Sequence, residues 1–350
     1  MIDTTKVSRS QTIQRPYVSS RPIAATLILT VGIIFLLVSI AISISFGAAD
    51  ISLRDVWQAV FHFDNTIHDQ QVIQELRLPR VLGALLVGAS FAVAGALMQG
   101  MTRNPLADSG LLGLNSGAAL AMAVCFALFP DTSYIWLMVF SFIGAAVGAA
   151  IVFGVGTMPR GGLTPVRLVL AGAAISILFS AISEGISLYF RIGQDLAFWF
   201  AGGVSGTRWS HLTVLAPVVI IAIGCAVALS RSITLLSLGD EIATGLGQKT
   251  QLIKLSGTLL VLVLAGAAVS VIGPVGFVGL IIPHLTRYIV GVDYRFIIPC
   301  SAVLGALLMV WADFAARIIN PPYETPVGAL ISLIGVPFFL YLSRKERRTL

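Results

Sequence analysis

Long apolar runs are the feature that most restricts how this chain can fold. A helix that crosses a bilayer needs about 20 mostly apolar residues. Ten segments of the sequence meet or approach this criterion, near residues 22–47, 80–101, 111–129, 134–156, 164–187, 210–230, 252–272, 276–291, 295–317 and 326–343. We therefore predict an all-α integral membrane protein with about ten transmembrane helices.

The composition agrees with a chain that lies mostly in lipid. Apolar residues make up 57% of the sequence and charged residues 11%, whereas a soluble domain carries about 25% charged residues. The net charge of +6 does not indicate nucleic acid, because the basic residues form short clusters between apolar runs. Cys125, Cys225 and Cys300 lie inside apolar runs, and their spacing indicates neither a disulfide framework nor a metal site.

The distribution of basic residues predicts the orientation in the membrane. With the N-terminus inside, the inside segments hold 16 of the 22 Lys and Arg residues and the outside segments hold 6. This excess follows the positive-inside rule and requires an even number of spans. The first apolar run is far longer than the apolar region of a signal peptide, about 7–15 residues, so we assign it to the first span. We expect a basic cytoplasmic tail at 1–21, a transmembrane domain at 22–343 and a basic cytoplasmic tail at 344–350.

Catalytic and cofactor-binding motifs are missing from the sequence. The run from Gly245 to Thr250 resembles a phosphate-binding loop, but Gln248 stands where a glycine is required and no strand precedes it. His284 could serve as a proton or metal group, although such a histidine more often bonds a neighbouring backbone group. We predict that the chain is not an enzyme and binds no metal or cofactor itself.

Charged residues within the predicted spans are few and lie toward the outer helix ends. Glu184, Asp313 and Arg317 are examples, and Asp313 and Arg317 are spaced for an ion pair on one helix face. An ion-coupled carrier normally needs a charge near the midplane of the membrane. The pattern therefore favours a transporter driven by another polypeptide, with an ion-coupled secondary transporter or a structural or exporter subunit as the alternatives.

Two of the connections between predicted spans are long. The outer one, near residues 48–79, has the apolar spacing of a short amphipathic helix at Leu53, Trp57 and Phe61. The inner one, residues 231–251, has apolar residues at helical spacing from Leu238 to Gly247, with acids near the predicted helix start and glycines at its end. A cytoplasmic amphipathic segment of this kind either contacts a soluble partner or lies on the lipid surface.

Several short motifs occur in order along the chain: Arg77-Leu78-Pro79-Arg80, Ala96–Gly100, Arg103–Asp108, Gly110–Gly113, Leu238–Ala243 with Leu246-Gly247, Gly276–His284 with Arg287, Ala312-Asp313 with Arg317, and Glu324 with Pro326–Gly328. Together they resemble the permease family of ABC importers for iron–siderophore complexes, haem and vitamin B12, which has the FecCD-like, type II importer fold. The resemblance covers residues 22–343.

The resemblance implies ten helices per subunit and a set of partner proteins. These are a second permease subunit, identical or paralogous, two ATP-binding subunits that use ATP and Mg²⁺ on the inside, and a substrate-binding protein outside. The expected setting is the bacterial cytoplasmic (inner) membrane. The implied activity is import of a ferric siderophore by alternating access, with haem or vitamin B12 as alternative cargo.

The resemblance also implies site residues. Arg77, Arg80 and Arg317 match arginines that dock the binding protein, and they could instead form internal salt bridges or interfacial anchors. The ATPase-coupling positions are Leu238, Gly239, Asp240, Glu241, Ala243, Leu246 and Gly247. The cytoplasmic gate positions are Asn104, Leu106, Thr164 and Pro165, for which a tight turn between helices is the alternative interpretation.

Overall fold

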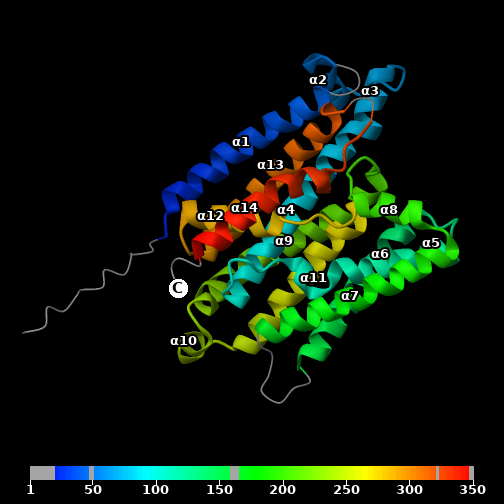
Figure 1. Ribbon diagram of the computed structural model, residues 1–350. Coiled ribbons are helices and arrows are strands. Elements are labelled where there is room, and N and C mark those ends of the chain that lie inside the picture. Colours follow the sequence, from blue (N-terminus) through cyan, green and yellow to red (C-terminus); the bar gives the residue numbers. More distant parts are fainter. Residues whose placement is uncertain (1–19, 47–50, 158–164, 321–322, 347–350) are drawn as a thin grey trace, which may run out of the picture.

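The computed structural model describes residues 20–46, 51–157, 165–320 and 323–346 (Figure 1). Every regular element in these ranges is a helix. The predicted cytoplasmic tails fall largely outside them, at residues 1–19 and 347–350.

Ten apolar helices of the described chain correspond to the ten predicted spans. They are α1 (Pro22–Ser45), α4 (Leu78–Thr102), α5 (Leu114–Leu128), α6 (Tyr134–Thr157), α7 (Pro165–Phe190), α9 (Trp209–Ser237), α11 (Thr250–Ile272), α12 (Val278–Val290), α13 (Tyr294–Ile318) and α14 (Val327–Glu346). Seven are long and apolar enough to cross a membrane by themselves, and α5, α12 and the apolar part of α14 are shorter. The predicted fold class is confirmed.

Shorter helices cap the two ends of the bundle. On the outer side lie α2 (Leu53–Phe61), α3 (His68–Val72), the π-helical turn η1 (Ile73–Arg77) and α8 (Gly193–Ala201). On the cytoplasmic side lie the 3₁₀ turn η2 (Ser109–Leu112) and α10 (Asp240–Gly245). Both amphipathic segments predicted from the long connections are therefore helical, as α2 and α10.

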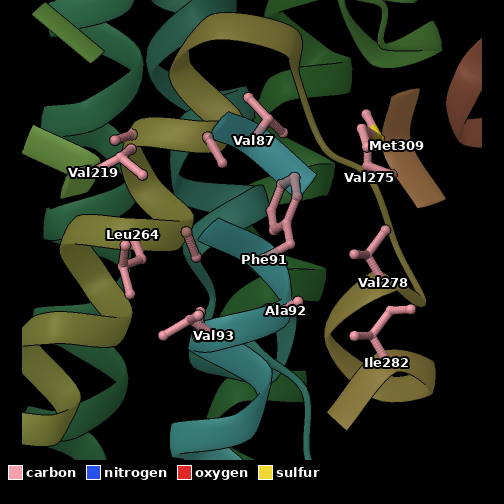
Figure 2. Packing of buried hydrophobic residues seen from close by; sticks show 14 of the residues in the cluster. Val87, Phe91, Ala92, Val93, Val219, Leu264, Val275, Val278, Ile282 and Met309 are labelled. Carbon is pink, nitrogen blue, oxygen red and sulfur yellow. The ribbon is translucent and has the colours of Figure 1, made fainter. Parts of the chain in front are cut away.

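Helix α4 is the centre of the bundle. In its most apolar stretch 83% of the residues are buried, against 22% for α1 and 28% for α9. It packs against α13, α11, α9 and α12. Figure 2 shows Val87, Phe91 and Val93 of α4 between Val219 of α9 and Leu264 of α11 on one side, and α12 and α13 on the other. The outer and inner motifs at the two ends of α4 are therefore held by one well-packed helix.

Glycines allow these helices to approach closely. A Cβ atom on Gly95 of α4 would overlap the carbonyl oxygen of Gly279 in α12, and one on Gly88 would overlap that of Gly305 in α13. The Gly144 and Gly148 pair of α6 meets α5 in the same way. Small residues at such positions let membrane helices pack backbone to backbone.

Helix α12 is short because the chain before it is not helical. Gly273 and Phe277 both have positive φ, at 77° and 68°, which ends α11 and delays the start of α12 until Val278. The eighth span, expected from residue 276, thus begins two residues later. The segment between the two helices passes close to Gly202 after α8 and to Gly328 of α14.

We expect Gly95→Ala to destabilise the bundle, because the added methyl group has no room between α4 and α12. Overpacking of this kind typically costs about 1–3 kcal/mol. Thermal unfolding of the purified chain in detergent should show a lower midpoint. Gly224→Ala on α9 is the matched control, since its Cβ would meet no atom within 4 Å. An unchanged midpoint for Gly95→Ala would contradict the close helix contact.

Candidate functional site

A buried cluster of charges lies at the outer end of the bundle, where α4, α13 and the α13–α14 connection meet. Arg80 donates to Asp313 through Nε (3.0 Å) and Nη2 (2.9 Å), and through Nη1 to Glu324 (2.5 Å). Arg80 is 9% exposed and Asp313 is fully buried. The guanidinium thus binds two carboxylates at once, one 233 residues and the other 244 residues away in sequence.

Arg77 and Arg317 extend this cluster to the first helix. Arg77 Nη1 donates to the carbonyl oxygen of Ile44 (2.5 Å), and Arg317 Nη2 donates to the carbonyl and hydroxyl oxygens of Ser43 (3.0 and 2.5 Å). Arg317 Nε lies 3.4 Å from Asp313, so the ion pair expected from the sequence is present. All three arginines predicted to dock a binding protein thus meet around the outer ends of α1, α4 and α13.

The electrostatics of Glu324 follow from this arrangement. Burial acts to raise the pKa of Glu324, but the hydrogen bonds and positive charge of Arg80 outweigh it, so the pKa lies below its ordinary value. About half of its side chain is exposed, in contrast to Asp313. The internal salt-bridge interpretation of Arg80 is therefore realised, and docking through these arginines stays a prediction.

The cytoplasmic segment from Leu238 to Gly247 forms the short helix α10 between two backbone turns. Gly239 has φ 131° and Gly247 has φ 82°, conformations that favour glycine. Ala243 is fully buried against the bundle. The glycines therefore set the direction in which the chain leaves α9 and enters α11.

The opposite face of this segment is apolar and exposed. Leu238, Ile242 and Leu246, which together we call the apolar stripe, are 55%, 52% and 62% exposed. Helical spacing puts Ile242 and Leu246 on one side of α10, and Leu238 lies just before the Gly239 turn. Ile242 was not among the predicted coupling positions, although its spacing from Leu238 and Leu246 carries the signal. Glu241 is exposed beside this stripe.

Asp240 links α10 to the rest of the cytoplasmic side. It accepts a hydrogen bond from Lys254 of α11 (2.5 Å), and Arg103 at the end of α4 lies 3.9 Å away. Arg103 has a left-handed backbone, φ 54°, which turns the chain out of α4. The sequence did not predict this bridge between α10 and the turn at the end of α4.

Two of the predicted gate residues, Asn104 and Leu106, lie directly after this turn. Asn104 accepts a hydrogen bond at Oδ1 from the backbone N–H of Leu106 (2.9 Å), which closes a tight turn, and Leu106 is half-buried. Pro165 is the first residue of α7, and Thr164 lies outside the described residues. Gating by these residues stays a prediction.

A polar network inside the cytoplasmic half was also missed from sequence. Arg287 Nη2 donates to Gln99 Oε1 and to the Tyr294 hydroxyl, both at 3.0 Å, and Gln99 Nε2 donates to the Gly279 and Leu280 carbonyls. This network joins α4, α12 and α13. No group of three or more potential metal ligands occurs among the described residues.

Comparison with known proteins agrees with this architecture. The family model of the FecCD transport family matches residues 35–345. The iron(3+)-hydroxamate import system permease protein FhuB of Bacillus subtilis (strain 168) is 54% identical, over 95% of this chain and 86% of the relative. The hemin transport system permease protein HmuU of Yersinia pestis is 40% identical, over 90% and 95%.

A solved structure gives the same fold. The inward-facing conformation of a metal-chelate type ABC transporter superposes with a TM-score of 0.80 at 30% identity, and the match covers 91% of this chain and 99% of that one. The ten-helix bundle is therefore that of a type II ABC importer permease, a multi-pass subunit of the cytoplasmic membrane. The chain belongs to the FecCD transport family.

We expect Arg80→Gln to destabilise the outer end of the bundle, because it removes the bidentate partner of a fully buried carboxylate. Breaking a buried pair costs about 3–5 kcal/mol, and the remaining contact of Asp313 with Arg317 favours the lower figure. Unfolding in detergent should show this loss, and Asp313→Asn in the same chain should restore part of it. Arg54→Gln, at an exposed position of α2, is the control. Equal stability of the Arg80→Gln and Arg54→Gln variants would contradict the buried charge cluster.

The lowered pKa of Glu324 predicts a stability change in acid. Because the native pKa lies below the ordinary value of 4.5, this carboxylate stabilises the fold above that pH. The contribution is lost as the pH falls from 4.5 through the lowered native value. A series of thermal unfolding midpoints against pH should therefore fall less steeply for Glu324→Gln than for the native chain. Parallel curves would show that Arg80 does not hold this carboxylate.

Proposed function

We propose that the chain forms one half of the membrane path of an importer for ferric siderophores of the hydroxamate class. Two separate ATP-binding subunits would drive it by alternating access. The observation that carries the ATP-driven part of the proposal is the apolar stripe of Leu238, Ile242 and Leu246 on the cytoplasmic side.

The stripe supports contact with a soluble partner for three reasons. It leaves three large apolar side chains exposed on a helix of only six residues, Asp240–Gly245, and its flanking turns. The helix is fixed on its other side by buried Ala243 and by the Asp240–Lys254 ion pair. An exposed apolar surface that is attached to the bundle on its other side can bind in a cleft on another protein and transmit its movement.

A route for that movement is present in the contacts of Asp240. A displacement of α10 would move Lys254 of α11 and Arg103 at the cytoplasmic end of α4, because both contact Asp240. Arg103 adjoins the Asn104–Leu106 turn, which we propose as part of the cytoplasmic gate together with Thr164 and Pro165. Closure of the ATP-binding subunits would thus shift the gate and the coupling helix together.

The cargo proposal depends on the relatives. The iron(3+)-hydroxamate permease is 54% identical over nearly the whole chain. The hemin permease, at 40%, keeps haem as the second candidate, and vitamin B12 is supported by the motif resemblance alone. An ion-coupled carrier gains no support from a family of ABC permeases.

The proposed assembly follows from this function. It contains a second permease subunit, identical or paralogous, two ATP-binding subunits and an extracytoplasmic binding protein. We propose that this chain binds no cofactor and that ATP and Mg²⁺ are bound by the partner subunits.

The outer arginine cluster is the proposed docking position for the binding protein. Since Arg80 already holds Glu324, and Glu324 is the half-exposed partner, an incoming carboxylate would exchange with Glu324 rather than with buried Asp313. Arg77 and Arg317 would then keep the outer end of α1 in place during docking.

We expect Ile242→Glu to abolish assembly with the ATP-binding subunits, because it puts a charge in the middle of the apolar stripe. Co-purification of the ATP-binding subunits with the tagged chain measures assembly, and cellular uptake of iron presented as a ferric hydroxamate measures transport. Ile242→Leu should leave both unchanged. Gly247→Arg, beside the stripe, should act as Ile242→Glu does.

Two outcomes would overturn parts of the proposal. Assembly that survives both Ile242→Glu and Gly247→Arg would show that α10 is not the coupling helix. Uptake of haem in preference to the ferric hydroxamate by the native complex would replace the proposed cargo and leave the coupling assignment intact.

A further inference from the structure

A shallow groove runs between α9 and α11 on the lateral surface of the bundle. Its volume is about 470 Å³, and its walls are Cys225, Ala228 and Leu229 of α9 and Ser256, Leu259, Leu260 and Val263 of α11. The faces of these helices that pack inward carry other residues, such as Ala226 and Val261, which are fully buried. The groove therefore opens toward the lipid, with walls that are small or apolar except for the Ser256 hydroxyl.

The groove lies at the depth of the cytoplasmic leaflet. Ser256 is six residues after the start of α11, or about 9 Å along the axis, and Cys225 is twelve residues before the end of α9, or about 18 Å. One leaflet contributes about 15 Å of hydrocarbon. The groove thus matches the region that acyl chains of that leaflet occupy.

Two exposed cations stand at its cytoplasmic end. Arg231 follows Ala228 by three residues on α9, so helical spacing puts it beside the groove wall. Lys249 directly precedes α11, the helix that forms the other wall. Among the described residues, neither side chain has an ion-pair or hydrogen-bond partner. Lys254 lies on the other flank of α11 and forms an ion pair with Asp240.

We propose that this groove binds an anionic phospholipid of the cytoplasmic leaflet, with an acyl chain along the α9–α11 walls and the phosphate headgroup between Arg231 and Lys249. The apolar walls need an apolar tail, and the two cations need an anion within reach of it. A basic residue near the membrane surface favours an anionic lipid about fivefold. A soluble anion would pair with Arg231 and Lys249 but would leave the apolar groove empty. An anionic lipid would pair with the two cations and also fill the groove with an acyl chain.

The position of the site gives it a consequence for transport. Helices α9 and α11 are the two that hold α10, so a lipid bound between them would brace the coupling helix from the membrane side. This consequence depends on the proposed function, whereas the lipid site itself does not.

Native mass spectrometry of the full purified chain in neutral detergent tests the proposal. We expect phosphatidylglycerol to be retained more tightly than phosphatidylcholine with the same acyl chains. Arg231→Gln together with Lys249→Gln should weaken phosphatidylglycerol retention about thirtyfold. Ala228→Phe should weaken retention of both lipids, because it fills the groove at an exposed position and leaves the charges in place. Arg344→Gln, an exposed arginine at the end of α14, should change nothing.

Cys225 reports the location of the bound lipid. It is the exposed cysteine, while Cys125 and Cys300 are buried, so N-ethylmaleimide should modify Cys225 first. Added phosphatidylglycerol should slow this modification in the native chain and leave it unchanged in the Arg231→Gln, Lys249→Gln variant.

Four results would overturn the proposal. The first is equal retention of phosphatidylglycerol and phosphatidylcholine by the native chain. The second and third are unchanged phosphatidylglycerol retention by the Arg231→Gln, Lys249→Gln variant and by Ala228→Phe. The fourth is displacement of bound phosphatidylglycerol by soluble glycerol phosphate as effectively as by added phosphatidylglycerol. Loss of ATP-binding subunits from the double variant with lipid retention unchanged would assign the two cations to the protein partner instead. None of these readouts requires transport, so they stand apart from the test of the importer.

Discussion

The close backbone contact of α4 with α12 and α13 is the constraint on which the rest of the structure depends. Within a membrane, apolar side chains gain little by leaving lipid for protein, so helices associate through close packing. Gly88 and Gly95 let α4 touch Gly305 and Gly279 backbone to backbone. Because α4 carries Arg80 at one end and Arg103 at the other, its placement sets the positions of both the outer charge cluster and the inner turn.

The two ends of α4 are held by different kinds of interaction. At the outer end, a buried network joins Arg80 to Asp313 and Glu324, and such a network is stable only when each charge is paired. At the cytoplasmic end, Arg103 lies within 3.9 Å of Asp240, and both side chains are partly exposed. The inner contact is the weaker one, since exposed ion pairs contribute little to stability.

Helix α10, the proposed coupling helix, lies at the edge of the bundle. Its buried residue, Ala243, is small, whereas three large apolar residues in α10 or at its two ends are exposed. The same two helices that hold it, α9 and α11, form the groove that faces the cytoplasmic leaflet. The proposed protein partner and the proposed lipid would therefore act on the same pair of helices, one from the cytoplasm and one from the membrane.

The sequence by itself determined the class of fold, the number of spans and the position of α10. Apolar length, basic-residue bias and helical spacing are local properties, and bilayer thickness converts them directly into topology. Only the tertiary structure decided the partners of the charges: Arg80 with Asp313 and Glu324, Asp240 with Lys254, and Arg287 with Gln99. These contacts join residues up to 244 positions apart, and no local pattern records which helices will be neighbours. For the same reason the α9–α11 groove could not be seen in the sequence, because its walls are two helix faces that only packing brings together.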